Sequence, residues 1–128
     1  DKVKYLDQVK QIVEENQLLE NAIFSSGDPE LWEKIGQTKG ILAALDIDDK
    51  AALHMVSGGN YIYVMAPYRL FTQQFMQELK GVKNRYGQSI IPIAYTVNDI
   101  FTYRRLKQLG IEYMMTDTFK TLAEESKK

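Results

Sequence analysis

Two patterns of apolar residues alternate along the chain. Short apolar runs, typical of buried strands, occur at residues 21–25, 41–45, 61–66, 90–95 and 111–115. Between these runs, apolar residues recur at every third or fourth position, which predicts helices at residues 2–16, 28–36, 50–56, 72–86 and 100–109. Apolar strands that alternate with helices indicate an α/β fold with a parallel sheet and right-handed crossovers. Two architectures fit: the last part of a (β/α)8 TIM barrel, or an open doubly wound sheet of the flavodoxin-like kind.

Capping residues mark two of the helix ends. Asp28 precedes Pro29, and a carboxylate at the N-cap followed by proline at the first helical position is a strong helix start. Gly110 follows the helix that begins near Ile100, and glycine commonly ends a helix because it tolerates a positive φ. These signals predict where both helices lie relative to the neighbouring strands.

The size and composition restrict the class of protein. The chain has 128 residues, of which 45% are hydrophobic and 26% are charged, as in a globular domain. The net charge of -1 gives no basic surface for nucleic acid, and no apolar run is long enough for a transmembrane helix. Cysteine is absent, which excludes disulfides and a cysteine nucleophile. Because the chain begins at Asp1, we expect one domain over residues 1–123, cut from a longer protein, and a frayed polar tail over residues 124–128.

Polar residues follow both strands of the segment 90–117. Thr96, Asn98 and Asp99 come after the first strand, and Thr116 comes directly after the second. In parallel α/β folds the carboxyl ends of the strands meet at one edge, where binding and catalytic residues gather. This βαβ unit is therefore where we expect a site.

Three motifs of this unit are distinctive in combination: Tyr95-Thr96-Val97-Asn98, then Leu109-Gly110-Ile111, then Thr116-Asp117. They resemble the last two βα units of the glycerophosphodiester phosphodiesterase family, in which the seventh strand typically ends in W-T-V-N and the eighth in T-D. The earlier elements of the chain follow the order of that family's fourth, fifth and sixth strands. The resemblance implies that the chain is the C-terminal part of such a barrel.

The resemblance also implies which parts are missing. Family members carry a His-Arg pair, a Glu-x-Asp motif, a second histidine and a further acidic residue on their first three strands. These residues bind a divalent cation such as Ca²⁺ or Mg²⁺ and supply the acid and base. Hydrolysis of a diester needs such groups, whereas this chain has a single histidine, His54, and nothing that corresponds to those strands. We therefore expect no catalytic residue, metal ligand or cofactor in this chain, and no activity from it alone.

Three residues at strand ends are candidates for substrate binding, and each has a structural alternative. Tyr95 stands where the family has tryptophan, and is either a wall against a glycerol group or a core residue. Asn98 either contacts a ligand or caps the next helix. Ser25, together with Ser26, either binds a phosphate or forms the turn before the capped helix.

The other polar clusters carry ordinary structural interpretations. An EF-hand loop that began at Asp46 would need glycine and glutamate where Ala51 and Ser57 stand, so residues 46–49 are interpreted as helix-capping and solvated residues. We interpret His54 as a partly buried helix residue. No phosphate-loop motif follows any strand, which argues against a nucleotide-binding domain.

Two functions from different classes remain open. In the first, the longer protein hydrolyses glycerophosphodiesters, lipid head groups or glycerol-phosphate polymers. In the second, the chain is a non-catalytic interaction or ligand-binding module that self-associates, because a partial barrel leaves two unpaired sheet edges. The expected partner is a second copy, giving a homodimer, or the missing N-terminal barrel strands, with no nucleic acid and no membrane insertion. The compartment is not determined, with a slight preference for an extracytoplasmic or membrane-linked parent protein.

Overall fold

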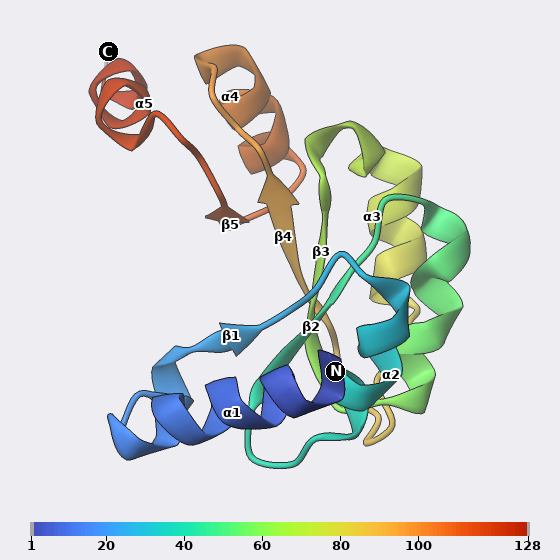
Figure 1. The fold of residues 1–128 in the computed structure, drawn as a ribbon. Coiled ribbons are helices and arrows are strands. Elements are labelled where there is room, and N and C mark those ends of the chain that lie inside the picture. The colour runs from blue at the N-terminus through green and yellow to red at the C-terminus, as the bar shows by residue number, and fades with distance from the viewer. Residues whose placement is uncertain (1, 128) are drawn as a thin grey trace.

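Five strands form one parallel sheet in chain order. The computed structural model describes residues 2–127. The strands are β1 (Ile23–Phe24), β2 (Leu42–Asp46), β3 (Tyr61–Pro67), β4 (Ile91–Tyr95) and β5 (Tyr113–Met114). They lie in the order β1-β2-β3-β4-β5, every neighbouring pair is parallel, and the sheet curls into a half-barrel (Figure 1). In a doubly wound sheet the strand order reverses direction, so the flavodoxin-like alternative is excluded and the partial TIM barrel is confirmed.

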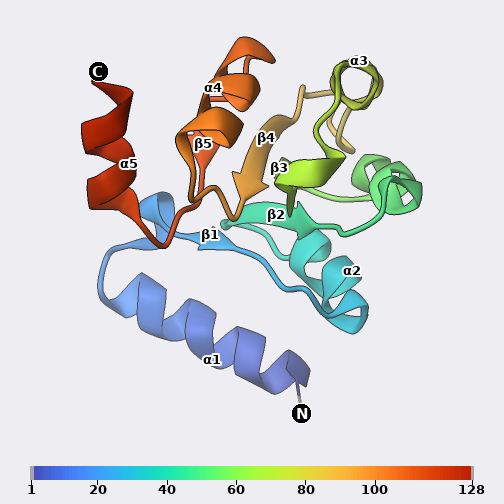
Figure 2. The ribbon, with the colours of Figure 1, turned by 90° about the horizontal axis from the view of Figure 1, so that it is seen from above.

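Helices cover the outer, convex side of the sheet. They are α1 (Lys2–Glu15), α2 (Pro29–Gln37), η2 (Lys50–Gly58), α3 (Gln73–Lys80), α4 (Ile100–Gln108) and α5 (Phe119–Ser126), with short 3-10 turns η1 (Leu19–Asn21) and η3 (Tyr68–Leu70). Seen from above, the helices surround the curled sheet, and the opening of the half-barrel lies between α1 and α5 (Figure 2).

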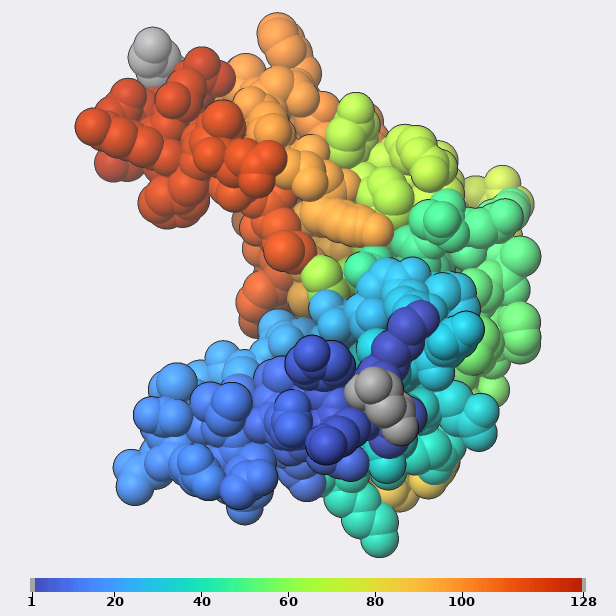
Figure 3. Space-filling view, in the orientation of Figure 1, coloured from blue at the N-terminus to red at the C-terminus, as the bar shows by residue number. Residues whose placement is uncertain are grey.

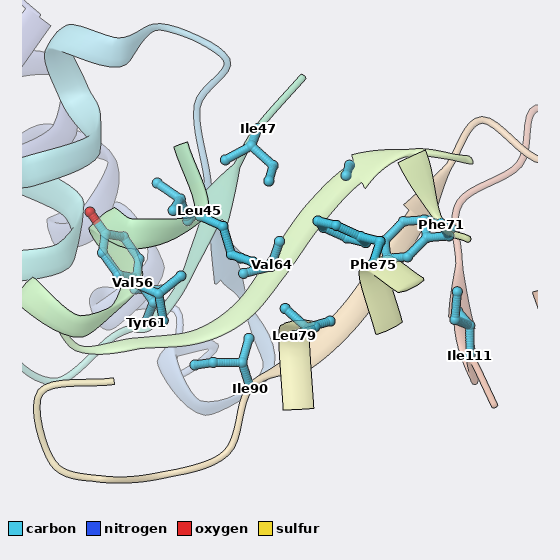
Figure 4. Packing of buried hydrophobic residues seen from close by; sticks show 14 of the residues in the cluster. Leu45, Ile47, Val56, Tyr61, Val64, Phe71, Phe75, Leu79, Ile90 and Ile111 are labelled. Atoms are coloured by element: carbon cyan, nitrogen blue, oxygen red, sulfur yellow. The ribbon is translucent and has the colours of Figure 1, made fainter. Parts of the chain in front are cut away.

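The main hydrophobic core lies between the sheet and these helices. Outward-facing strand residues pack against helix residues, and the cluster includes Phe24, Leu45, Val64, Ala94, Trp32, Ile35, Phe75, Leu79 and Leu106. Figure 4 shows the aromatic part of this packing, where the Phe71 and Phe75 rings meet edge to face with centroids 5.4 Å apart. The helical spacing of apolar residues therefore marks the side of each helix that faces the sheet.

A second, smaller cluster lies on the inner, concave side. It consists of Ala44, Met65 and Ile93, with Tyr63 packed against them. Side chains alternate along a strand, so these residues come between the outward-facing ones. The inner side is apolar at these positions, and none of the helices within residues 2–127 lies over it (Figure 2).

The predicted capping signals are confirmed. The Asp28 side chain accepts a hydrogen bond from the backbone N–H of Glu30, and Pro29 is the first residue of α2. Gly110 follows α4 with a φ of 92°, a conformation that residues with a Cβ rarely adopt.

The helix predicted over residues 72–86 is wrong at its C-terminal end, because α3 stops at Lys80. The buried side chain of Asn84 organises a turn there instead. Its Oδ1 accepts from the backbone N–H groups of Tyr86 and Gln88, and its Nδ2 donates to the carbonyl of Tyr61 at 3.0 Å. Asparagine competes with a helix by bonding to nearby backbone groups in this way.

The two edge strands are shorter than predicted, because each pairs on one side only. Residue 21 belongs to the turn η1, and β5 takes two residues of the run 111–115.

After β5 the chain forms α5, a helix that the sequence did not predict, and it includes residues 124–126 of the expected tail. Residue 128 lies outside the described residues. None of the helices between residues 2 and 127 is long and apolar enough to cross a membrane.

Candidate functional site

A hydrogen-bonded pair joins two strand ends at the carboxyl edge of the sheet. Asp46 is the last residue of β2 and Tyr95 the last residue of β4. The Tyr95 hydroxyl donates to Asp46 Oδ1 at 2.7 Å, across the end of β3. The other carboxylate oxygen of Asp46 faces Gly27 after β1, where a Cβ would lie 3.9 Å from it. The ends of β1, β2 and β4 therefore form one polar rim.

The surroundings raise the pKa of both the Asp46 carboxyl and the Tyr95 phenol. Burial raises the pKa of the Asp46 carboxyl, the bond from Tyr95 lowers it, and the charge of Asp48 raises it. Burial and the bond to Asp46 raise the pKa of the Tyr95 phenol well above its usual range, while the charge of Arg69 lowers it. At neutral pH Tyr95 is thus a neutral hydroxyl that donates to Asp46.

Sequence reasoning missed Asp46 as a site residue. It was grouped with Asp48 and Asp49 as helix-capping and solvated residues. Asp49 does cap η2, accepting from the backbone N–H of Ala51 at 2.9 Å, but Asp46 binds Tyr95 instead. The available signal was its position, because Asp46 ends an apolar strand just as Tyr95 does, and parallel strand ends meet at one edge.

Asn98 connects two loops at the same edge. Its Oδ1 accepts from the Thr116 hydroxyl at 3.0 Å and from the Asp117 backbone N–H at 2.9 Å. The alternative that Asn98 caps the next helix is wrong, because Asp99 is the N-cap of α4 and accepts from Thr102 N–H. Asn98 therefore holds the loop after β4 against the loop after β5.

Ser25 and Ser26 differ in their surroundings. The Ser26 hydroxyl accepts from the Asp28 N–H, and its carbonyl accepts from Trp32 Nε1 at 2.7 Å, so Ser26 forms the turn before α2. Ser25 is exposed and lines a hollow on the inner side of the sheet. Among the described residues, no hydrogen bond joins Tyr95, Asn98 and Ser25 to one another, and their roles in substrate binding stay predictions.

The hollow below the polar rim is apolar. Its volume is about 340 Å³, and it is lined by Ile23, Ser25, Met65, Ile93, Tyr113, Met114 and Met115. Three of these, Ile23, Tyr113 and Met115, are 43%, 49% and 48% exposed. In the space-filling view the molecule is C-shaped, with a deep notch between its N-terminal and C-terminal parts (Figure 3). The inner side thus combines an apolar floor with a polar rim at the carboxyl ends of the strands.

The acidic residues and the histidine do not gather into a metal centre. Within residues 2–127, no group of three or more Asp, Glu or His side chains is placed to hold an ion. His54 is exposed rather than partly buried, and its Nδ1 lies 2.7 Å from the carbonyl of Ala51. At the rim, Asp46 Oδ1 already accepts from the Tyr95 hydroxyl.

Comparison with known proteins places the fold. No protein-family model and no curated protein matches the sequence. The structure is similar to a protein of Silicibacter pomeroyi assigned as a glycerophosphoryl diester phosphodiesterase, with a TM-score of 0.71 and 15% identity over 91% of this chain. It is also similar to a phosphodiesterase of Oleispira antarctica that was solved with its product sn-glycerol-3-phosphate, with a TM-score of 0.61 and 16% identity over 83% of this chain.

The chain spans less than half of either structure, 41% of the first and 42% of the second. At these identities the likeness concerns the fold. It agrees with the interpretation of the motifs after β4 and β5. The chain therefore has the fold of part of a glycerophosphodiester phosphodiesterase barrel.

Proposed function

We propose that this chain is the C-terminal part of a phosphodiesterase that cleaves glycerophosphodiesters, lipid head groups or glycerol-phosphate polymers with a divalent metal. The observation that supports this most directly is the Tyr95–Asp46 pair, which lies at the carboxyl edge of a partial barrel. Barrel enzymes place their sites at that edge. The likeness of the fold to two phosphodiesterase structures agrees with it.

In this proposal the chain supplies binding surface rather than the reacting groups. The ring of Tyr95 is a wall for the carbon side of a glycerol group, and Asp46 accepts a hydrogen bond from a glycerol hydroxyl. Ser25 extends the rim on the β1 side, and Asn98 keeps the loop after β4 in place. Burial removes water from the Asp46 carboxyl and raises its pKa. A glycerol hydroxyl that donates to this carboxyl replaces a hydrogen bond that was lost with the water.

The described residues do not fit a complete metal site, as no three ligands converge. The metal ligands and the acid–base pair belong to the remainder of the barrel in this proposal. The chain alone is therefore expected to be inactive.

Two assays test this function. The isolated chain is incubated with bis(p-nitrophenyl) phosphate and with glycerophosphocholine, in Ca²⁺, in Mg²⁺ and in chelator. We expect no turnover above the blank, and metal-dependent turnover would refute the predicted inactivity.

The second assay uses a complete barrel, in which the unmatched part of the Silicibacter pomeroyi protein is fused ahead of Lys2. We expect metal-dependent hydrolysis of glycerophosphocholine. Tyr95→Ala should raise KM about tenfold with a smaller change in kcat, as expected when a contact made equally in the ground and transition states is lost. Tyr86→Ala, at an exposed tyrosine of the turn before β4, is the matched control and should change neither constant. A folded but inactive fusion would count against the proposed function.

A second candidate is a non-catalytic module that associates with itself. The observation in its favour is the uncovered apolar inner side, with Ile23, Tyr113 and Met115 about half exposed. Exposed apolar surface that is continuous and rimmed by polar residues marks interaction sites. Light scattering over a range of concentrations tests it: a homodimer supports this candidate, and a monomer at high concentration contradicts it.

A further inference from the structure

A short turn leaves the middle of the sheet beside the polar rim. This turn, η3 (Tyr68–Leu70), comes directly after Pro67, the last residue of β3. β3 lies between β2, which ends at Asp46, and β4, which ends at Tyr95. The hydrogen bond from Tyr95 to Asp46 spans the end of β3, and Pro67 pairs with Tyr95 in the sheet. The residues of η3 therefore follow the strand end over which this bond lies.

The guanidinium of Arg105, on α4, holds this turn at both ends. Its Nη2 donates to the carbonyl of Tyr68 at 3.0 Å, and its Nη1 donates to the carbonyl of Phe71 at 2.6 Å. The Phe71 side chain has no exposed surface, and the Phe71 N–H donates to the carbonyl of Tyr68 at 3.2 Å. A planar guanidinium that bonds to two carbonyls fixes their relative position. The backbone on both sides of Arg69 is therefore held against α4.

Arg69 is the middle residue of this turn, and its side chain is exposed. Within residues 2–127 both ion pairs are made by Lys2, and the Arg69 guanidinium makes no hydrogen bond. Burial and the bond to Asp46 raise the pKa of the Tyr95 phenol, whereas the charge of Arg69 lowers it. No other cation of the described chain acts in this way on Tyr95 or on Asp46. Arg69 is therefore the cation of the polar rim, and its N–H groups are available to a ligand.

The other charges of the rim are negative. Asp46 and Asp48 both act on the Tyr95 phenol by their charge, and Asp48 is exposed. A phosphodiester is itself an anion, so these carboxylates oppose its approach unless a cation stands beside them. A guanidinium also presents its N–H donors as a fork that fits two oxygens of a phosphoryl group. The rim therefore suits a ligand that offers a hydroxyl to Asp46 and a phosphoryl group to Arg69.

We propose that Arg69 binds a phosphoryl group of the ligand whose glycerol lies against Tyr95 and Asp46, and that Arg105 is a positioning residue that holds the turn of Arg69. The inference rests on the proposed function for the identity of this ligand, a glycerophosphodiester. It goes further because it gives the chain a phosphate subsite of its own, made by the turn after β3 and independent of the metal.

Binding to the isolated chain tests the subsite without any activity. The probes are inorganic phosphate, sn-glycerol 3-phosphate and glycerol, each titrated while the amide NMR shifts of the chain are followed. We expect sn-glycerol 3-phosphate to bind most tightly and to shift the amides of Arg69 and Tyr95. Arg69→Gln should weaken the binding of both phosphates about tenfold, because a charge-assisted hydrogen bond is lost, and should leave glycerol unaffected. Arg69→Lys keeps the charge without the fork and should recover part of the loss.

A double-mutant cycle separates positioning by Arg105 from a general structural role. Arg105→Gln should weaken phosphate binding about threefold and speed hydrogen exchange at the Phe71 amide, which closes the turn. In the Arg69→Gln background the same change should have no further effect on binding, because Arg105 acts through Arg69. Arg104→Gln is the matched control, since Arg104 is the neighbouring exposed arginine of α4 and makes neither bond to the turn. Circular dichroism checks that every variant is folded.

The subsite is refuted if neither phosphate binds the chain, if both bind Arg69→Gln as tightly as the parent, or if Arg104→Gln weakens them equally. Additive effects of Arg69→Gln and Arg105→Gln would refute the positioning role.

The fused barrel separates this inference from the proposed function. There, Arg69→Gln should raise KM for glycerophosphocholine by a larger factor than it lowers kcat. An active fusion with an unchanged KM contradicts only this inference. Phosphate binding that depends on Arg69 but gains nothing from the glycerol group contradicts only the proposed function.

Discussion

The two sides of the sheet differ in how completely they are covered, although both are apolar. On the outer side Leu45, Val64 and Ala94 have no exposed surface, because helices lie over them. On the inner side Ile23, Tyr113 and Met115 remain about half exposed, and one small cluster is buried by the curl of the sheet alone. Strands with apolar residues on both sides are typical of parallel sheets that are buried on both sides. The difference indicates that the outer side stabilises this chain through buried contacts, whereas the inner side leaves much of its apolar surface in contact with water.

The largest effect should come from a cavity on the outer side. Leu45→Ala removes a fully buried side chain and should lower the free energy of unfolding by about 2–5 kcal/mol. Met115→Ala, on the inner side, should lower it by less than about 1 kcal/mol because Met115 is already half exposed. Urea denaturation of both variants measures the difference. Equal losses would mean that the inner side is covered in solution.

The next effect should come from the connection between the last two loops. Asn98→Ala removes the acceptor used by Thr116 and Asp117, and should cost about 1–2 kcal/mol. Asn98→Asp keeps a side-chain oxygen at that position and should restore part of the loss. Hydrogen exchange at the Asp117 amide reports the bond directly. Unchanged exchange in Asn98→Ala would show that another group holds the loop.

The polar rim should respond more weakly. Tyr95→Phe removes the donor to Asp46 and should cost about 1 kcal/mol. The bond from Tyr95 lowers the pKa of Asp46, so that pKa should rise further in the variant. An NMR titration of the Asp46 carboxyl in both proteins measures this. A fall in the pKa would contradict the assigned direction of the hydrogen bond.

Asp46 also predicts a small dependence of stability on pH. Burial raises its pKa in the folded state above the ordinary value of 3.8, so the folded state binds the proton more tightly than the unfolded state. The stability that this contributes is complete below pH 3.8 and is lost as the pH rises through the folded pKa. Asp46→Asn should therefore match the parent at low pH and exceed it at neutral pH by about 0.5 kcal/mol or less, since the site is partly screened by water. Urea denaturation at pH 3.5 and pH 7 tests the sign.

The smallest change in stability should come from a charge on the inner side. Met115→Lys should alter the free energy of unfolding by about 0.5 kcal/mol or less, because the side chain reaches water. The same variant should reduce the binding of an apolar fluorescent dye to the hollow that Met115 lines. Tyr86→Lys, at an exposed tyrosine far from that hollow in the chain, controls for the added charge. Equal dye binding by both variants would place the dye elsewhere.

The sequence predicted the order of the elements well because apolar periodicity reports which side of each element is buried. It failed at residues 81–86, where Gly81 is the C-cap of α3 and the amide side chain of Asn84 forms the turn that follows. It also missed α5, whose one buried side chain, Leu122, gives little periodic signal.

The sequence made Tyr95 a candidate through its motif and its position at a strand end, and its role in substrate binding stays a prediction. The structure adds its hydrogen bond to Asp46. Its partner Asp46 lies 49 residues earlier in the chain, and no local pattern connects them. Asn98 was named as a candidate for substrate binding. Its bonds to Thr116 and Asp117 depend on how two loops meet, and a short stretch of sequence does not show that.

The pairing of strands in chain order also affects how the protein is made. Each strand pairs with the one before it, so every new βα unit that leaves the ribosome finds its neighbour already synthesised. Each pairing joins a strand to the one that directly precedes it in the chain, across the helical segment or segments between them. The uncovered edge therefore moves along the sheet as synthesis proceeds, from β1 to β5, and the half-barrel can grow by whole βα units from the N-terminus onward.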